Sequence, residues 1–180
     1  MAWSEASIIR AIGRQVLQRK CILLVDNCQW TGHECDVLGV TQDMRTIDIE
    51  VKISRADLKA DAKKDKWWHR RRNWLFQSSA YLDGQHGAPA PDMLREWPPK
   101  VWKHYYAMPL EIWQQALFDS LPSPSSGVLL LTERGGTVHV HCERRAKPDK
   151  DARVLTAAEA VDIARLANLR MWDAYCREAA

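Results

Sequence analysis

Hydrophobic residues recur at helical spacing near both ends of the chain. The N-terminal stripe follows a potential helix cap at Ser4 and consists of Ile8, Ile9, Ile12, Val16 and Leu17. At the other end, Thr156 and Glu159 form a capping-box pattern, which predicts a last helix over about 157–177. Both ends of the chain are therefore expected to be helical.

Between these helices, short apolar runs and alternating patterns predict β-strands. They lie at 21–25, 35–40, 46–53, 102–108, 128–132 and 137–142. The connection 41–45 is short enough for an antiparallel hairpin, and Gly135-Gly136 is typical of a second hairpin turn. We expect 128–132 in the interior of the sheet and 137–142 at its edge.

The central part of the chain mixes a polar helix with a segment rich in glycine and proline. Ser54 is a potential cap for a helix that starts at Arg55 and runs past Trp67 toward Tyr81, with Trp67 in the core. Residues 83–100 are predicted to form an exposed loop or flap. A short helix is expected over 110–118 after Pro109.

The resulting order is helix, three strands, helix, strand, helix, two strands, helix. It predicts an α/β (α+β) fold in which a central mixed β-sheet is flanked by helices. A length of 180 residues favours a single domain, residues 1–180. With 46% hydrophobic and 27% charged residues, the composition is that of a globular protein rather than a disordered one.

The chain shows no signal-peptide pattern and no apolar run that would cross a bilayer. Its five cysteines are an odd number without the spacing of a disulfide framework. These features predict a reduced, cytoplasmic protein. The net charge of +3 does not by itself indicate nucleic acid, and the oligomeric state is left open.

One predicted strand has an unusual polar face. In the two-residue period of 46–53, Asp48, Glu50 and Lys52 share one side, while the aliphatic residues take the other. Asp36 of the preceding strand can lie beside the same face. The pattern indicates a carboxylate cage for a divalent metal with an ammonium group next to it. The alternative is a solvated strand edge with a Glu–Lys pair.

Asp36 followed by Glu50-Val51-Lys52, in helix–strand–hairpin–helix order, resembles the PD-(D/E)XK nuclease superfamily. The string from Glu50 to Asp61, with Lys66-Trp67 after it, is similar to MmcB-like DNA-repair nucleases and related phage-encoded proteins. Segments 105–109, 127–130 and 165–172 are similar to those proteins too. One departure is Cys35, which stands where the superfamily pattern has a proline that is dispensable.

The resemblance implies a restriction-endonuclease-like core and hydrolysis of DNA phosphodiester bonds with Mg²⁺ or Mn²⁺. Asp36 and Glu50 would be metal ligands, and the backbone carbonyl of Val51 would add a third oxygen, as suits a hard cation. The metal would stabilise charge on the phosphate. Lys52 would orient or help deprotonate the attacking water.

Four further residues are secondary candidates. Glu5 matches an acidic position in the first helix that some members of the superfamily use near the metal, although a surface Glu that complements the helix dipole is the alternative. Glu34 shares its predicted strand face with Asp36 and is a candidate ligand or neighbour. Asp48 is expected to be a solvated neighbour or a water-mediated contact. His33 is a candidate phosphate contact, although a merely exposed loop residue is the favoured alternative.

A basic stretch follows the predicted site and is the candidate DNA-binding surface. Residues 63–72 hold six Lys or Arg against one Asp. Phosphate contacts and stacking on unpaired bases would come from Lys63, Lys66, Arg70, Arg71, Arg72 and Trp74. The alternative is a solvated charge run.

Two other interpretations remain open or are disfavoured. A DNA-binding or assembly protein that keeps the fold without hydrolysis would bind DNA but not cut it. A zinc site built from His139, His141 and Cys142, with Cys28 and Cys35, is disfavoured because Cys142 points to the other strand face and no C-x-x-C pair exists.

Overall fold

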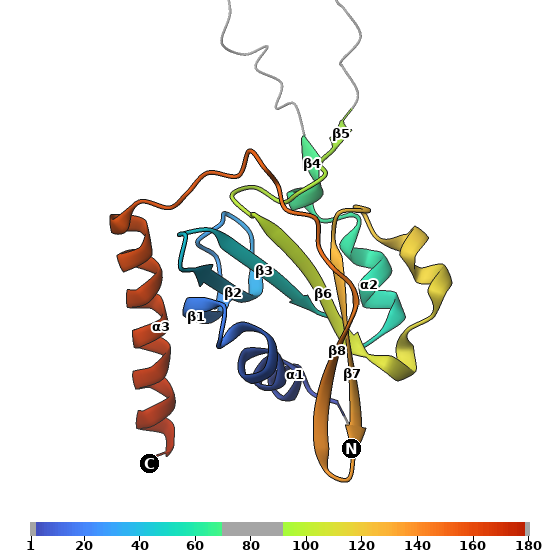
Figure 1. Ribbon diagram of the computed structural model, residues 1–180, viewed down its shortest axis with the longest axis horizontal. Coiled ribbons are helices and arrows are strands. Elements are labelled where there is room, and N and C mark those ends of the chain that lie inside the picture. Colours follow the sequence, from blue (N-terminus) through green and yellow to red (C-terminus); the bar gives the residue numbers. More distant parts are fainter. Residues whose placement is uncertain (1–2, 70–91, 179–180) are drawn as a thin grey trace, which may run out of the picture.

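The computed structural model describes residues 3–69 and 92–178 and is built on a six-stranded mixed sheet (Figure 1). The strand order is β1-β2-β3-β6-β7-β8. The bounds are β1 Cys21–Cys28, β2 Cys35–Thr41, β3 Thr46–Val51, β6 Lys103–Pro109, β7 Gly127–Arg134 and β8 Thr137–Arg144. The β3–β6 and β6–β7 pairs are parallel, whereas the outer pairs are antiparallel.

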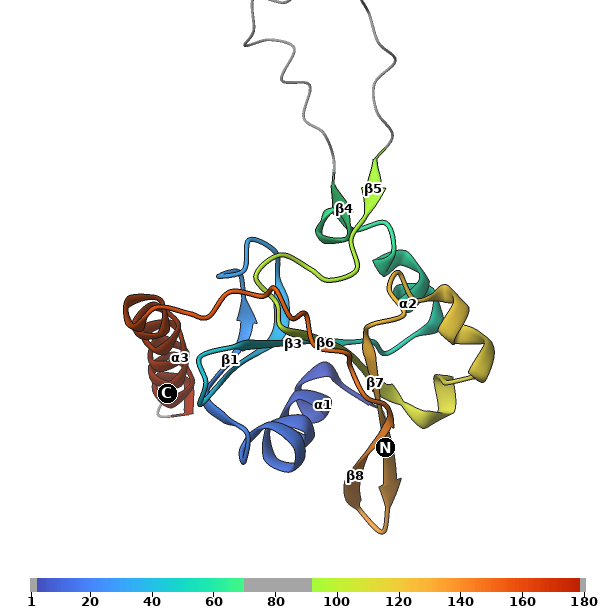
Figure 2. The same ribbon diagram turned by 45° about the horizontal axis from the view of Figure 1, so that its top comes forward.

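The helices lie on both faces of this sheet (Figures 1 and 2). The α-helices are α1 Glu5–Ile12, which continues as the π-helical turn η1 Gly13–Leu17, α2 Arg55–Asp61 and α3 Ala157–Glu178. The short 3-10 helices are η2 Asp65–Trp67, η5 Leu110–Ile112 and η6 Gln115–Ser120. A separate two-stranded ribbon pairs β4 Trp68–His69 with β5 Met93–Leu94.

One face of the sheet is apolar along its middle strands and is covered by α1 and η1. Ile8, Ile12 and Leu17 of this helical segment are buried against Ile49 of β3 and Leu129 of β7. These helical residues are the ones predicted from the N-terminal periodicity. Ser4 caps α1, since its side chain accepts a hydrogen bond from the Ser7 N–H.

The other face carries two separate apolar clusters. At one end, Ile163 of α3 packs with Leu38 and Val40 of β2. Toward the other end, Leu58 of α2 packs with Met108 of β6 and with further residues of β6 and β7. Between these clusters, the same face is polar along β3 and the start of β6. The candidate site lies there.

The predicted fold class and both hairpins are confirmed. Gly135 and Gly136 adopt φ values of +56° and +76°, which the tight turn between β7 and β8 requires. The edge position of β8 and the interior position of β7 are as predicted.

The predicted helix begins at Arg55 as expected but is wrong over 62–69, and its possible extension over 70–81 lies outside the described residues. The backbone leaves the helix and is extended at Lys64, so that Lys66 and Trp67 turn inward and are buried. The stretch 110–118 forms two short 3-10 helices instead of one α-helix. Of the predicted loop 83–100, residues 92–100 are described and include β5, whereas 83–91 lie outside the described residues.

No helix in the described part of the chain is long and apolar enough to cross a lipid bilayer.

The packing of α3 predicts a position-specific loss of stability. The side of α3 that faces the sheet carries Ile163, which is 0% exposed, whereas Val161 on the same helix is 66% exposed. We expect Ile163→Ala to lower the free energy of unfolding by about 2–4 kcal/mol, because a buried cavity is created. Val161→Ala is the matched control and should change it by less than about 0.5 kcal/mol. Urea denaturation of both variants measures this, and equal losses would contradict the packing.

Candidate functional site

The register of two parallel strands gathers the polar residues of the site. Asp48 of β3 lies opposite His104 of β6, and Glu50 lies opposite Tyr106. Residues directly opposite one another project to the same face of a sheet. All four side chains are buried. The predicted polar face of β3 is therefore real, but it is enclosed instead of solvated.

Both oxygens of Glu50 are held by lysine ammonium groups. Lys66 Nζ lies 2.5 Å from Oε1, while Lys52 Nζ and Lys64 Nζ lie 3.1 and 3.2 Å from Oε2. Burial opposes ionisation of Glu50, but the charges of Lys66 and Lys52 outweigh it and lower the pKa of this carboxyl. Glu50 is thus a charged side chain within the protein interior.

A second buried carboxylate, Asp61 at the end of α2, binds the same lysines. Its Oδ1 lies 3.1 Å from Lys52 Nζ and 3.0 Å from Lys64 Nζ. Its Oδ2 accepts hydrogen bonds from Trp67 Nε1 at 2.9 Å and from the Tyr106 hydroxyl at 2.5 Å. Despite burial, Lys66 and Lys52 hold the pKa of Asp61 well below its ordinary value.

These five residues form one lysine–carboxylate cluster, consisting of Glu50, Asp61, Lys52, Lys64 and Lys66. Three ammonium groups face two carboxylates, and Asp48 and Asp57 add negative charge close to Lys66 and Lys52. The side chain of Lys64 is 48% exposed, so the cluster reaches solvent there. Burial lowers the pKa of Lys52, but the two carboxylates more than reverse this, and the ammonium stays protonated.

Asp36 lies next to this cluster but makes no ion pair among the described residues. Its Oδ2 accepts a hydrogen bond from the Val51 N–H at 2.6 Å, which places it beside the backbone between Glu50 and Lys52. Burial and the negative charge of Glu50 raise the pKa of Asp36 to about 6, and Glu5 adds to the effect. Asp36, Glu50 and Glu5 therefore form an acidic group in which Asp36 is poorly neutralised.

That arrangement fits a hard divalent cation on chemical grounds. Burial and the neighbouring negative charges both oppose ionisation of Asp36, and a cation placed beside this carboxyl would offset both effects. The predicted ligands Asp36 and Glu50 supply oxygen atoms, as Mg²⁺ and Mn²⁺ prefer. Glu5 is exposed on α1 and acts on Asp36 through its charge.

Two expectations about neighbouring residues are wrong. Asp48 is not a solvated neighbour, because its side chain is fully buried and its Oδ2 lies 3.1 Å from His33 Nε2. Burial opposes its charge, but the His33 hydrogen bond and Lys66 lower the pKa of Asp48 to about 2. His33 is accordingly folded inward, with a side chain that is 12% exposed.

The other predicted residues have mixed outcomes. Glu34 is exposed before β2 and lines a surface hollow with Trp30, Leu166 and Arg170, away from the lysine–carboxylate cluster. Lys63 is exposed, as a phosphate contact requires. Lys66 is instead buried against Glu50, so its role as a surface phosphate contact is wrong. Arg70, Arg71, Arg72 and Trp74 lie outside the described residues.

The sequence pattern missed Asp61, Lys64, His104 and Tyr106. Asp61 stands in the string that carries the resemblance, but its spacing gives no hint that it faces Glu50. Lys64 belongs to the basic run, but nothing in its spacing indicates a contact with Glu50 or Asp61. The parallel pairing of β3 with β6 was the missing information, since it brings His104 and Tyr106 beside Asp48 and Glu50.

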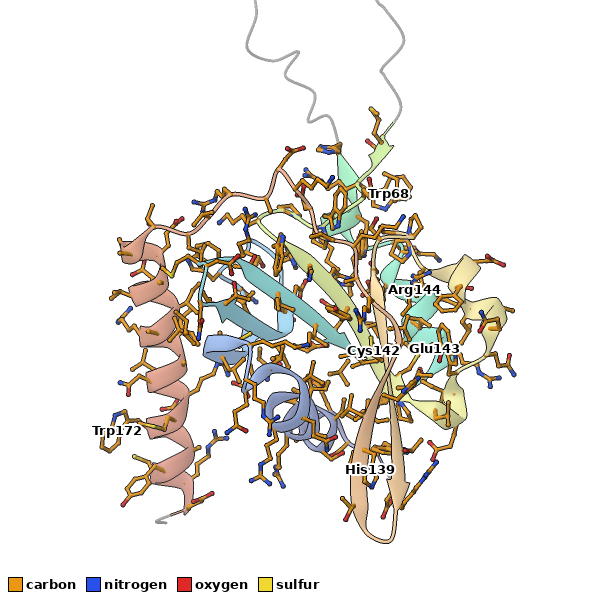
Figure 3. All side chains as sticks on the ribbon, viewed as in Figure 1. Trp68, His139, Cys142, Glu143, Arg144 and Trp172 are labelled. Carbon is orange, nitrogen blue, oxygen red and sulfur yellow. The ribbon has the colours of Figure 1, made fainter. Side chains whose placement is uncertain are left out.

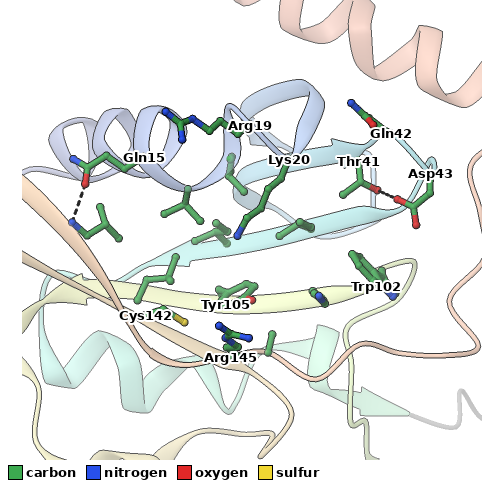
Figure 4. Close-up of a pocket in the computed structure, with 18 residues that line it drawn as sticks. Gln15, Arg19, Lys20, Thr41, Gln42, Asp43, Trp102, Tyr105, Cys142 and Arg145 are labelled. Carbon is green, nitrogen blue, oxygen red and sulfur yellow. Dashed lines mark hydrogen bonds between the residues drawn. The ribbon is translucent and has the colours of Figure 1, made fainter.

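Other polar features lie away from the cluster. A cleft of about 770 Å³ opens on the opposite face of the sheet, beside Ile47 and Ile49, and is lined by Arg19, Lys20 and Arg145 (Figure 4). His139, His141 and Cys142 are exposed on the edge strand β8 (Figure 3).

The buried charges predict a sharp cost for removing Asp61. In Asp61→Asn the amide keeps an acceptor for Trp67 and Tyr106 but leaves three lysines with one carboxylate. We expect a loss of about 3–5 kcal/mol in the free energy of unfolding at pH 7, because an uncompensated buried charge remains.

The same change should alter the response to acid. A carboxyl with a depressed folded pKa stabilises the fold above its unfolded pKa and loses this contribution as the pH falls. Acid unfolding of Asp61→Asn should therefore depend less on pH than that of the wild type. Asp57→Asn is the control, since Asp57 is 46% exposed and 3.9 Å from Lys52. Equal effects of the two changes, measured by urea denaturation across pH, would argue against the cluster.

Comparison with known proteins adds information on the fold. No protein-family model and no curated protein matches this chain. Among solved structures, it is similar to the SPO1766 protein of unknown function from Silicibacter pomeroyi, with a TM-score of 0.54 and 18% identity. The match covers 97% of this chain and 91% of that chain. The two proteins thus share an overall fold over nearly their full lengths.

Proposed function

We propose that this protein is a metal-dependent nuclease of the PD-(D/E)XK type that hydrolyses phosphodiester bonds of DNA. The observation that carries the proposal is the position of Asp36 beside Glu50 and Lys52. Asp36 accepts a hydrogen bond from the Val51 N–H, and burial together with the negative charge of Glu50 raises the pKa of Asp36. Two acidic groups and a protonated lysine thus meet at the residues that carry the sequence motif.

Mg²⁺ or Mn²⁺ would be held by Asp36, Glu50 and the backbone carbonyl of Val51, and it would supply positive charge against the scissile phosphate. For this, Glu50 has to give up one of its lysine contacts. Lys64 is the suitable one, because its half-exposed side chain can turn into solvent, whereas Lys52 and Lys66 are buried.

Lys52 would act as a positive hydrogen-bond donor. Its ammonium lies 3.1 Å from Glu50 and 3.1 Å from Asp61, and these carboxylates raise its pKa. A lysine that stays protonated is a poor proton acceptor, so of the two predicted roles we favour orienting the water and balancing the charge of the transition state. Asp61 would hold Lys52 in place for this task.

DNA would approach where the cluster reaches solvent. Lys63 and Lys64 are exposed at this position and suit phosphate oxygens, which lysine binds as a point charge. Arg70, Arg71 and Arg72 follow in the sequence and remain proposed contacts. A role in bacterial or phage DNA repair in a reducing cytoplasm belongs to the same proposal. It is compatible with all five cysteines being free thiols.

The proposal predicts metal-dependent cleavage that requires this group of residues. Purified protein incubated with plasmid, linear and branched DNA should cut at least one of them with Mn²⁺ or Mg²⁺, and not with EDTA. Asp36→Asn, Glu50→Gln and Lys52→Met should each lower the rate by about 100-fold or more, because each removes charge stabilisation in the transition state.

Glu34→Gln is the matched control, since Glu34 is an exposed carboxylate near Asp36 in sequence and outside the cluster. It should cut at the wild-type rate. Salt-dependent DNA binding without cleavage by the wild type would instead favour the non-catalytic alternative, a DNA-binding or assembly protein. Cleavage that survives in Lys52→Met would disprove the role of Lys52.

The raised pKa of Asp36 gives a second prediction, on stability. Because the folded pKa of about 6 exceeds the ordinary 3.8, the folded state keeps a proton that the unfolded state releases, and this contribution to stability is lost as pH rises from about 4 to above 6. Asp36→Asn should remove this loss. In metal-free buffer at pH 8 the variant should be more stable by about 1–2 kcal/mol, a value reduced for solvent screening.

Added Mn²⁺ should raise the melting temperature of the wild type and leave that of Asp36→Asn unchanged. Differential scanning fluorimetry with and without Mn²⁺ measures both effects. An Mn²⁺ shift of equal size in the two proteins would contradict the proposed metal ligands.

A further inference from the structure

A second group of potential metal ligands lies farther along the same sheet face. His33 in the loop before β2, Cys35 of β2 and Asp48 of β3 each direct one ligand atom into the same place, and the three atoms lie within 4.8 Å of one another. His33 is partly buried, whereas Cys35 and Asp48 are buried. These residues are not part of the proposed Asp36–Glu50 metal site.

Two buried polar atoms at this place have no hydrogen-bond partner within residues 3–69 and 92–178. One is Asp48 Oδ1 and the other is His104 Nε2. His104 Nε2 lies 3.9 Å from Asp48 Oδ2, and both side chains are fully buried. Leaving such atoms unpaired costs about 1–3 kcal/mol each. A bound ion between Asp48 and His104 would give both atoms a partner and remove this cost.

The surrounding hydrogen bonds orient these residues as ligands. His104 Nδ1 lies 3.0 Å from Ser126 Oγ, so a proton on Nδ1 leaves the Nε2 lone pair directed toward Asp48. Thr31 Oγ1 donates its hydroxyl proton to the His33 carbonyl at 2.9 Å and lies 3.2 Å from Cys35 Sγ, so it connects the loop of His33 with Cys35. Partners of this kind commonly fix the tautomer and direction of metal-binding side chains.

A catalytic cysteine is the competing interpretation of a Cys–His–Asp group, and the surroundings of Cys35 argue against it. Its side chain is 0% exposed, which denies access to a substrate. Burial and the charge of Asp48 raise the pKa of this thiol, whereas a nucleophilic cysteine needs a lowered one. His104 is neutral as well, because burial and Lys66 lower its pKa to about 4.

We propose that His33, Cys35, Asp48 and His104 bind a structural zinc ion. Nitrogen, sulfur and carboxylate oxygen are the ligand types that zinc accepts. His33, Cys35 and Asp48 already lie together, and His104, whose Nε2 is 3.9 Å from Asp48 Oδ2, would complete a tetrahedral set by a shift of its side chain toward them. With metal–ligand bonds of about 2.0–2.3 Å, tetrahedral ligands lie about 3.3–3.8 Å apart. His33 Nε2 and His104 Nε2 lie 3.1 and 3.9 Å from Asp48 Oδ2, close to this range. Asp48 Oδ1, the oxygen without a hydrogen-bond partner, belongs to the same carboxylate and is an alternative ligand atom.

The charge balance and the position support zinc at this place. Zn²⁺ with one thiolate and one carboxylate has no net charge, which suits a buried position next to the ammonium of Lys66. The ion would connect the loop before β2 with β2, β3 and β6. It would thus stabilise the strand that carries Glu50 without taking part in cleavage.

The test is the metal content of the intact protein. After expression with zinc and removal of loosely bound metal, elemental analysis should find one zinc ion per chain. Replacement by Co²⁺ should give the intense absorption of a tetrahedral site together with a thiolate-to-cobalt charge-transfer band. Stripping with a strong chelator should lower the melting temperature, and added Zn²⁺ should restore it.

Variants separate this site from exposed histidines and cysteines. Cys35→Ser should lose the thiolate band, and His104→Gln should weaken zinc binding at least 10-fold. Cys142→Ser and His139→Gln on exposed β8 are the matched controls and should keep both. If the two site variants do not fold, the metal content and the cobalt spectrum of the wild type still test the zinc proposal.

Folded wild-type protein that holds no zinc after supplementation, or zinc without a thiolate band, would overturn the proposal. The result is independent of the nuclease activity. Asp36→Asn should keep its zinc ion, so loss of cleavage in that variant with zinc retained separates the two metal sites.

Discussion

The network of ion pairs between Glu50, Asp61 and three lysines is the constraint on which the rest of the structure depends. Removing a charge from water costs several kcal/mol, and only close partners offset it. The chain therefore has to leave the helix after Asp61 so that Lys64 and Lys66 reach Glu50. It also has to pair β6 with β3, because Tyr106 then donates a hydrogen bond to Asp61.

The sheet separates these charges from the apolar packing. On one face, α1 and η1 cover a continuous hydrophobic layer, and on the other the packing divides into a cluster under α3 and a cluster next to α2. The polar strip between them holds the lysine–carboxylate cluster, with Asp36 at its side, and the His33–Cys35–Asp48–His104 group. Asp36 and Glu50 offer only oxygen ligands. The His33–Cys35–Asp48–His104 group adds nitrogen and sulfur ligands, so the two groups suit different metals.

Much of the fold and part of the site could be predicted from the sequence. Alternation and hairpin turns identified the strands, and the motif pointed to Glu50 and Lys52, because these signals are local. The neutralisation of Glu50 by Lys64 and Lys66 could not be predicted, since it depends on where the chain turns after Asp61. Likewise, periodicity placed Asp48 on a polar face but could not show that this face is covered, which made Asp48 and His33 look exposed.

The central claim is that Asp36 and Glu50 hold a catalytic divalent cation. A crystal soaked in Mn²⁺ tests it most directly, because the anomalous signal locates the ion without any substrate. The account predicts a peak between the Asp36 and Glu50 carboxylates, with Lys64 turned away from Glu50. A map without a peak there, in which Lys52, Lys64 and Lys66 all still contact Glu50, would contradict it.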